Sequence, residues 1–307
     1  MTDAPSLSGF KPKDLPDLTG TRAVVTGANS GIGYHAAAAL ADHGAEVVLA
    51  VRNTEAGREA AKRMKGMVSV EELDLASQTS VHAFADRLDG SIDVLVNNAG
   101  VMTPPKYRET AEGHELQFGT NHLGHFALTG LLLPALLKSE APRVVTVASI
   151  AHHRGDESVV EGNPKASYDP RRSYGNSKLA NLLFAFELHR RAEEATSRLV
   201  SAACHPGVSA TNLVGSPDGM GSNLVVRKTA PFFMPVIFQS SASGANPTLW
   251  AATYGAPGSY VGPTWLMESR GRLGEAKLSR HARDADLARR LWDVSEARTG
   301  VTFDLSL

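Results

Sequence analysis

From Thr21 onward the chain alternates short runs of β-branched and aliphatic residues with longer segments rich in Ala and Leu. The short runs are typical of buried strands and the longer segments of helices, and their alternation indicates a parallel sheet with helices on both faces. Strands are expected at 23–26, 46–51, 68–73, 92–96, 143–148, 199–204 and 259–261. Helices are expected at about 31–43, 55–64, 77–88, 112–137, 173–195 and 241–254. The pattern predicts a single doubly wound α/β domain with a seven-stranded parallel sheet.

Three segments depart from this alternation. Residues 1–20 are polar and rich in proline, which excludes a signal peptide and predicts an N-terminal arm ahead of a domain at 21–307. Residues 151–172 are polar, and residues 206–240 are punctuated by Gly and Pro. Both segments leave the carboxyl edge of the expected sheet, where open parallel sheets bind ligands. The segment at about 206–240 is therefore the expected substrate loop.

Composition and charge narrow the functional classes. The chain of 307 residues has a formal charge of −1 and a pI near 6.8. Without an excess of Lys and Arg it lacks the electrostatic signature of a nucleic-acid-binding protein. Cys204 is the only cysteine, so no intrachain disulfide can form and a reducing, cytoplasmic location is expected. The apolar run at 231–238 is too short for stable membrane insertion, which needs ~20 helical residues.

A glycine-rich turn joins the first expected strand to the first helix. Gly27, Gly31 and Gly33 would let the backbone approach a pyrophosphate, which the N–H groups and positive dipole end of the helix attract. The spacing is Gly-x-x-x-Gly-x-Gly and differs from the commoner Gly-x-Gly-x-x-Gly. Asn29 and Ser30 add short polar side chains to the same cradle. The turn predicts a dinucleotide site.

The end of the second strand distinguishes the two nicotinamide dinucleotides. An acidic residue there accepts the ribose hydroxyl in NAD-specific proteins, whereas an Arg suits a 2′-phosphate. This chain has Arg52 and Asn53 and no carboxylate, which favours NADP(H) over NAD(H), although a solvated Arg at a strand end is the alternative.

Polar residues also close the next two strands. The Asp74 carboxylate, beside Leu75, could accept the adenine amino group. Asn97, Asn98, Ala99 and Gly100 close the fourth strand and would lie beneath the adenosine ribose and the nicotinamide side, although an Asn pair followed by Gly is also compatible with a plain turn.

The candidate chemistry lies in the second half of the chain. Tyr174 and Lys178 stand four residues apart on one helical face, and a cation beside a phenol favours phenolate, so the pair could trade a proton near neutral pH. Ser149 ends the fifth strand, where its hydroxyl can reach a substrate carbonyl. Asn121 is a poor helix former inside an expected long helix, and could hold a water leading to Lys178. A surface pair, a strand-ending serine and a packing amide are the alternatives.

The ordered motifs resemble those of the short-chain dehydrogenases/reductases over residues 20–303. Segments 48–53, 118–126 and 291–301 are similar to the branch of retinol dehydrogenases, protochlorophyllide reductases and WW-domain oxidoreductases. The resemblance implies a Rossmann-like fold and an oxidoreductase that moves hydride between NADP(H), or NAD(H), and a carbonyl/alcohol pair.

The resemblance also implies roles for individual residues. Tyr174 would be the general acid/base, Lys178 would lower its pKa and hold the nicotinamide ribose, Ser149 would polarise the carbonyl and Asn121 would complete a proton relay. The implied cofactor contacts are Gly27, Asn29, Ser30, Gly31, Ile32, Gly33, Arg52, Asn53, Asp74, Leu75, Asn98, Ala99, Gly100, Tyr174, Lys178, Pro206, Gly207, Val208 and Thr211.

Several partners remain open at this stage. The apolar residues of 206–240 favour a small to medium, apolar substrate, but no polar side chain identifies it. A non-catalytic NAD(P)-binding redox sensor or scaffold is the alternative, because fold does not fix function. Pairing through long helices, common in the family, leaves a homo-oligomer open. The histidines have no spacing typical of a metal site, so no metal is expected.

Overall fold

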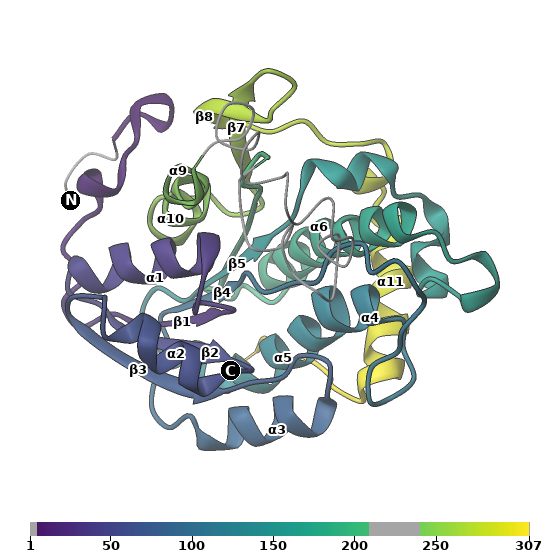
Figure 1. Cartoon of the computed structure of the whole chain (residues 1–307), viewed down its shortest axis with the longest axis horizontal. Helices are drawn as coiled ribbons and strands as arrows, with labels where there is room; N and C mark the ends of the chain where they lie inside the picture. The colour runs from purple at the N-terminus through teal and green to yellow at the C-terminus, as the bar shows by residue number, and fades with distance from the viewer. Residues whose placement is uncertain (1–4, 209–239, 307) are drawn as a thin grey trace.

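The computed structural model describes residues 5–208 and 240–306, in which one β-sheet forms the centre of the molecule (Figure 1). The strand order is β3-β2-β1-β4-β5-β6-β7-β8. Strands β1 to β7 are parallel, and β8 pairs antiparallel with β7. The strands are β1 (Arg22–Thr26), β2 (Glu46–Val51), β3 (Met67–Glu72), β4 (Val94–Asn97), β5 (Arg143–Val147), β6 (Val200–Cys204), β7 (Tyr260–Trp265) and β8 (Arg270–Glu275).

Helices cover both faces of this sheet (Figure 1). The apolar sides of α1 and α10 pack on one face, and those of α3, α5, α6 and α11 pack on the other. The described α-helices are α1 (Gly31–Asp42), α2 (Thr54–Ala61), α3 (Gln78–Arg87), α4 (Leu116–Phe118), α5 (Gly124–Leu136), α6 (Pro170–Glu194), α9 (Ser241–Gly244), α10 (Asn246–Thr253) and α11 (Ala285–Thr299). This arrangement confirms the single-domain, doubly wound α/β fold.

The expectation of seven parallel strands is wrong by one strand, since β8 adds an antiparallel edge in the described part of the chain. Leu273 is its only buried residue, and Gly271 and Gly274 interrupt a run of charged residues. Such a sequence lacks the β-branched residues by which the other strands were predicted. The chain turns back from β7 through Leu266 and Met267, whose φ angles are 48° and 55°.

The helix expected at 112–137 begins later and is not uniform. The Glu115 carboxylate accepts hydrogen bonds from the backbone N–H groups of Gln117 and Phe118, so it caps α4 and the helix starts there. A π-helical turn, η3 (Gly119–Leu123), then joins α4 to α5. Such wide turns within helices occur mostly at functional sites.

Two capping residues explain further differences, while the helix expected at 241–254 is divided into α9 and α10. Asp169 accepts from the Arg172 backbone N–H at 2.7 Å, so α6 begins before the expected residue 173. Helix α11 was not expected at all. It is capped by Asp284, which accepts from the Leu287 N–H at 2.9 Å, and it ends at Gly300 with a φ of 69°.

The arm before β1 lies against the sheet layers. Phe10, Leu15 and Leu18 are buried in the same apolar cluster as α1 and α10. Phe10 also meets the Trp250 ring edge-on at 5.4 Å, and the Tyr254 hydroxyl donates to the backbone carbonyl of Asp14 at 3.0 Å. The expected substrate loop at about 206–240 lies mostly outside the described residues, and with it Thr211.

Candidate active site

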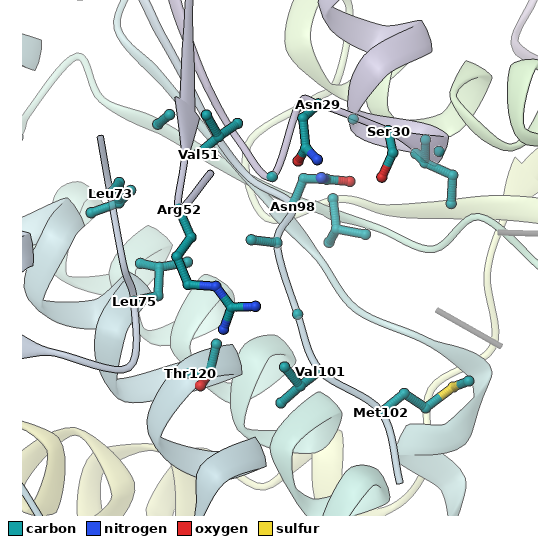
Figure 2. A pocket seen from close by; sticks show the side chains of 18 of the residues that line it. Asn29, Ser30, Val51, Arg52, Leu73, Leu75, Asn98, Val101, Met102 and Thr120 are labelled. Atoms are coloured by element: carbon teal, nitrogen blue, oxygen red, sulfur yellow. The ribbon is translucent and has the colours of Figure 1, made fainter. Parts of the chain in front are cut away.

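A pocket, seen from close by in Figure 2, lies at the carboxyl edge of the parallel strands, where β1, β2, β3, β4 and β5 end. We call it the sheet-edge pocket. Its walls are formed by Gly27, Asn29, Ser30, Gly31, Ile32, Gly33, Ala50, Val51, Arg52, Leu73, Asp74, Leu75, Asn98, Ala99, Gly100, Val101, Met102, Thr120, Val147, Ala148, Tyr174, Lys178 and Pro206. Fifteen of these residues were predicted from the sequence to contact a cofactor. The fold therefore brings the two halves of the predicted site together.

The glycine-rich turn is held tightly against the end of β4. Gly27 and Gly31 have φ angles of 66° and 60°, which side chains rarely allow. A Cβ atom on Gly33 would lie 2.5 Å from the Asn98 Nδ2 atom and 2.8 Å from the Gly27 carbonyl oxygen. The Asn98 amide in turn donates to the Thr26 carbonyl at 2.7 Å. The turn consequently opens the N-terminus of α1 onto the pocket, as a pyrophosphate site requires.

The end of β2 supplies a cation to the pocket. The exposed Arg52 side chain extends from β2 over the pocket toward Thr120 in Figure 2. The hydroxyl of Thr120 is buried and has no hydrogen-bond partner among the described residues. Asn53 does not line the pocket, because its side chain accepts from the Ala56 backbone N–H and caps α2. This end of the pocket can bind an anion and offers no carboxylate at the end of β2.

The Asp74 and Leu75 pair forms the neighbouring wall. One oxygen of the Asp74 carboxylate accepts from the Ala76 backbone N–H at 3.0 Å, which fixes the orientation of that carboxylate. The backbone N–H of Asp74 donates to the hydroxyl of Ser80 at 2.9 Å. Both residues line the sheet-edge pocket, so this carboxylate is in place to accept an amino group.

Tyr174 and Lys178 lie at the far end of the same pocket. Both project from α6, and the Lys178 Nζ atom lies 5.9 Å from the centre of the Tyr174 ring. The ammonium group donates to the Val147 carbonyl at 3.1 Å, which holds α6 against the end of β5. Ser149 follows β5 and interacts with the phenol, while its hydroxyl accepts from the Ala151 backbone N–H at 3.2 Å. The predicted acid/base group, cation and hydroxyl are thus assembled.

Burial shifts both titratable groups toward their neutral forms. The protein around Tyr174 raises its pKa to about 12, although part of the side chain is exposed, and the interaction with Ser149 offsets only part of this increase. Burial lowers the pKa of Lys178 to about 8. The direction for Tyr174 is opposite to the sequence-based expectation that Lys178 lowers the phenol pKa. The physical reason is that desolvation of the phenolate is the larger effect, while the ammonium group is bound to the Val147 carbonyl.

Asn121 is buried on the π-helical turn and does not itself line the pocket. Its Oδ1 atom accepts from the Val101 backbone N–H at 2.7 Å, and its Nδ2 atom donates to the Val101 carbonyl at 2.9 Å and the Ser177 hydroxyl at 2.9 Å. A Cβ atom on Gly100 would lie 3.0 Å from Asn121 Oδ1 and 3.6 Å from Lys178 Nζ. Asn121 therefore lies near the Lys178 end of the pocket. Hydrogen bonds to Val101 and Ser177 already engage its side-chain amide.

Pro206 is the last predicted contact that lines the pocket. Gly207 and Val208 lie just beyond it: the Gly207 N–H donates to the Nδ1 atom of His205 at 3.2 Å, and the Val208 N–H donates to the Ser269 carbonyl at 2.9 Å. Sequence reasoning missed Thr120, Val101 and Met102, because an apolar residue or a threonine carries no motif of its own. Their only signal was their position beside the Asn and Gly residues of the motifs.

No group of three or more His, Cys, Asp or Glu side chains in 5–208 and 240–306 is placed to hold a metal ion. No helix in the same part of the chain is both long and apolar enough to cross a bilayer.

Comparisons with known proteins show the family to which the chain belongs. A family model described as short chain dehydrogenase matches residues 21–218. Retinol dehydrogenase 14 of Mus musculus is 38% identical over 311 residues, covering 92% of this chain and 87% of that protein. Retinol dehydrogenase 11 of Homo sapiens is 37% identical over 299 residues, covering 94% of this chain and 88% of that protein.

Two solved structures extend the comparison to the fold. An uncharacterised protein from Mycobacterium paratuberculosis superposes with a TM-score of 0.82 at 44% identity, covering 97% of this chain and 100% of that chain. A short chain dehydrogenase from Shigella flexneri, solved in complex with NADP, superposes with a TM-score of 0.58 at 25% identity. That match covers 80% of this chain and 97% of the Shigella flexneri chain.

Proposed function

Since the chain belongs to the short-chain dehydrogenase family, we propose that it is an NADP(H)-dependent oxidoreductase that interconverts a carbonyl and an alcohol, with Tyr174 as general acid/base. The observation that carries the proposal is that Tyr174 and Lys178 line the same pocket as the glycine-rich turn. A dinucleotide lying along that pocket from the turn would extend toward the phenol. A protein that had lost catalytic activity would have no need to keep both the glycine-rich turn and the Tyr174 and Lys178 pair.

The cofactor would be held by the walls of the sheet-edge pocket. The backbone at Gly31 and Gly33 would bind the pyrophosphate, Asp74 the adenine amino group, and Lys178 the nicotinamide ribose. Arg52 would bind a 2′-phosphate, and the Thr120 hydroxyl, which has no hydrogen-bond partner in 5–208 and 240–306, would be a second donor. A bound nicotinamide dinucleotide supplies hydride for reduction or takes it up for oxidation.

The side chains of the chain itself manage the proton. With a pKa of about 12, Tyr174 keeps its proton at neutral pH and can donate it to the oxygen of a carbonyl as that carbonyl is reduced. The Ser149 hydroxyl, next to the phenol, would donate a hydrogen bond to the same oxygen and stabilise its developing negative charge. Lys178, with a pKa of about 8, is mostly cationic at pH 7 and supports the charge left on the phenol.

The substrate is proposed to be an apolar aldehyde, ketone or alcohol. The pocket wall beyond Gly100 is formed by Val101 and Met102, which offer apolar surface and no charge. Relatives that align over most of this chain are named retinol dehydrogenases, so a retinoid is a rational first trial. We also propose that the enzyme acts in the cytoplasm, an assignment that rests on the single cysteine.

A substrate panel tests the proposed function. Purified protein would be incubated with retinal, aliphatic and aromatic aldehydes and ketones, and either NADPH or NADH, and the matching alcohols with both oxidised forms. Turnover of at least one carbonyl, abolished in Tyr174→Phe, is expected. If NADPH binds and no member of the panel is turned over, the chain is better explained as a dinucleotide-binding sensor or scaffold.

A further inference from the structure

His125 is a buried histidine near the pocket with a partner on each ring nitrogen. It lies on α5 and is 2% exposed. The Nδ1 atom lies 2.9 Å from the backbone carbonyl oxygen of Asn121, and the Nε2 atom lies 2.9 Å from the Thr26 Oγ1 atom. The imidazole therefore connects the π-helical turn to the end of β1.

The hydrogen-bond partners determine where each proton lies. A backbone carbonyl only accepts, so Nδ1 of His125 must carry the ring proton and Nε2 must be the acceptor. With Nε2 unprotonated, the Thr26 hydroxyl donates to it at 2.9 Å in preference to its other acceptor, the Val96 carbonyl at 3.3 Å. The same hydroxyl accepts from the backbone N–H groups of Asn98 and Ala99, each at 2.9 Å. Burial lowers the pKa of His125 to about 4, and the nearby charge of Lys178 acts in the same direction. The ring is consequently neutral, with one fixed tautomer, at physiological pH.

This chain of hydrogen bonds joins elements from the two halves of the site. Asn98 and Ala99 line the cofactor end of the sheet-edge pocket, whereas Asn121 lies beside Lys178. A second link runs in parallel, because Asn97 Nδ2 donates to the Thr129 hydroxyl, which donates to the backbone carbonyl of His125. The Asn121 side chain adds a direct link to the backbone of Val101, at 2.7 and 2.9 Å, while the imidazole of His125 bonds the backbone carbonyl of Asn121.

We propose that His125 is a positioning residue that fixes the distance between the pocket floor at Asn98 and Ala99 and the π-helical turn that carries Asn121. It touches neither substrate nor cofactor and acts through Thr26 and Asn121. The inference rests on the proposed function, since it assigns His125 a part in that same site. A displacement of about 1 Å in a catalytic group can lower turnover by about 100-fold, so even a small shift of the turn should be measurable.

Substitutions at His125 separate positioning from simple packing. His125→Leu keeps an apolar body and removes the hydrogen bonds to Thr26 and to the Asn121 carbonyl, whereas His125→Gln retains one donor and one acceptor on a planar group. We expect kcat to fall between about 10-fold and 100-fold in His125→Leu, with KM and the NADPH Kd changed less than threefold. His125→Gln should recover a large part of kcat. Thr26→Val should behave like His125→Leu, and the double variant should lose less than the sum of the two losses.

A spectroscopic measurement tests the same network without turnover. In histidine-labelled wild-type protein, the ¹⁵N signals of His125, assigned by their loss in His125→Gln, should show a protonated Nδ1 and an unprotonated Nε2. They should not titrate between pH 5 and pH 9. In His125→Leu the backbone amide signals of Asn98 and Ala99 should shift.

Each outcome bears on the inference. An unchanged kcat in folded His125→Leu, equal losses in the Leu and Gln variants, or a His125 ring that titrates near pH 6.5 would overturn the positioning role. If His125→Leu does not fold, the wild-type ring signals and the His125→Gln kinetics still decide. A wild-type protein that turns over no substrate contradicts the proposed function instead, and the tautomer measurement remains valid.

Discussion

Arg52 should determine the cofactor preference, and Arg52→Gln is the change that tests this. The guanidinium lines the pocket where β2 ends, and Val51 beside it offers no carboxylate to a free ribose hydroxyl. A hydrogen bond to a charged group contributes roughly 1.5–3 kcal/mol. Because Arg52 is exposed and therefore screened by solvent, the lower limit applies, and it corresponds to about a tenfold change in Kd.

Fluorescence titration of both reduced cofactors measures the effect. Wild-type protein should bind NADPH at least about tenfold more tightly than NADH, and Arg52→Gln should weaken NADPH by about tenfold while NADH changes less than twofold. Arg58→Gln on α2 is the matched control, since Arg58 is also exposed and does not line the pocket. The NADPH preference should shrink at high salt. Tighter binding of NADH by wild-type protein, or equal weakening of both cofactors in Arg52→Gln, would refute the reasoning.

Three further predictions concern the catalytic end and the glycine turn. Tyr174→Phe should reduce kcat by ~10²–10⁴-fold, because it removes only the transferable proton. NADPH binding and the circular dichroism spectrum should be unchanged. A variant that keeps more than a tenth of wild-type turnover would contradict the assignment. The kcat for carbonyl reduction should be flat near pH 7 and decline as pH rises through about 8, where Lys178 loses its charge. A stopped-assay pH profile with no decline by pH 9.5 would exclude a role for the Lys178 charge in turnover. Gly33→Ala should lower Tm and weaken the binding of NADPH and NADH alike, because the added methyl group would lie 2.5 Å from Asn98 Nδ2. Gly9→Ala is the neutral control, since a Cβ atom there would have no atom within 4 Å.

The regular part of the fold could be predicted because local sequence and global structure agree there. The β2 strand matches its expected bounds of 46–51, since its apolar residues are buried on both faces. The two missed elements differ in their local signals. Apart from Leu273, β8 consists of charged residues and glycines, which do not indicate a strand. The α11 helix was missed although Asp284 caps it and its buried residues recur at helical spacing.

The sequence could predict which residues come together in the site, but not how those residues interact. Motifs at strand ends identify Gly27 and Asn98 because parallel strands bring their carboxyl ends together, and Tyr174 is identified by its spacing to Lys178 on α6. Burial is a property of the whole fold, so the raised pKa of Tyr174 could not be inferred from the spacing to Lys178. Thr120 reaches the pocket through a π-helical turn that no local pattern indicates.

The protonation states found at the site favour one direction of reaction at neutral pH. Tyr174, with a pKa of about 12, holds its proton, while Lys178, with a pKa of about 8, holds its charge. Carbonyl reduction needs a proton donor and a nearby cation that stabilises the phenolate left after the proton is donated. Tyr174 and Lys178 have these protonation states at neutral pH without any prior ionisation. Alcohol oxidation needs the phenolate first, and forming it in this buried setting is unfavourable at pH 7. The same two groups therefore make reduction the direction in which turnover should be measured first.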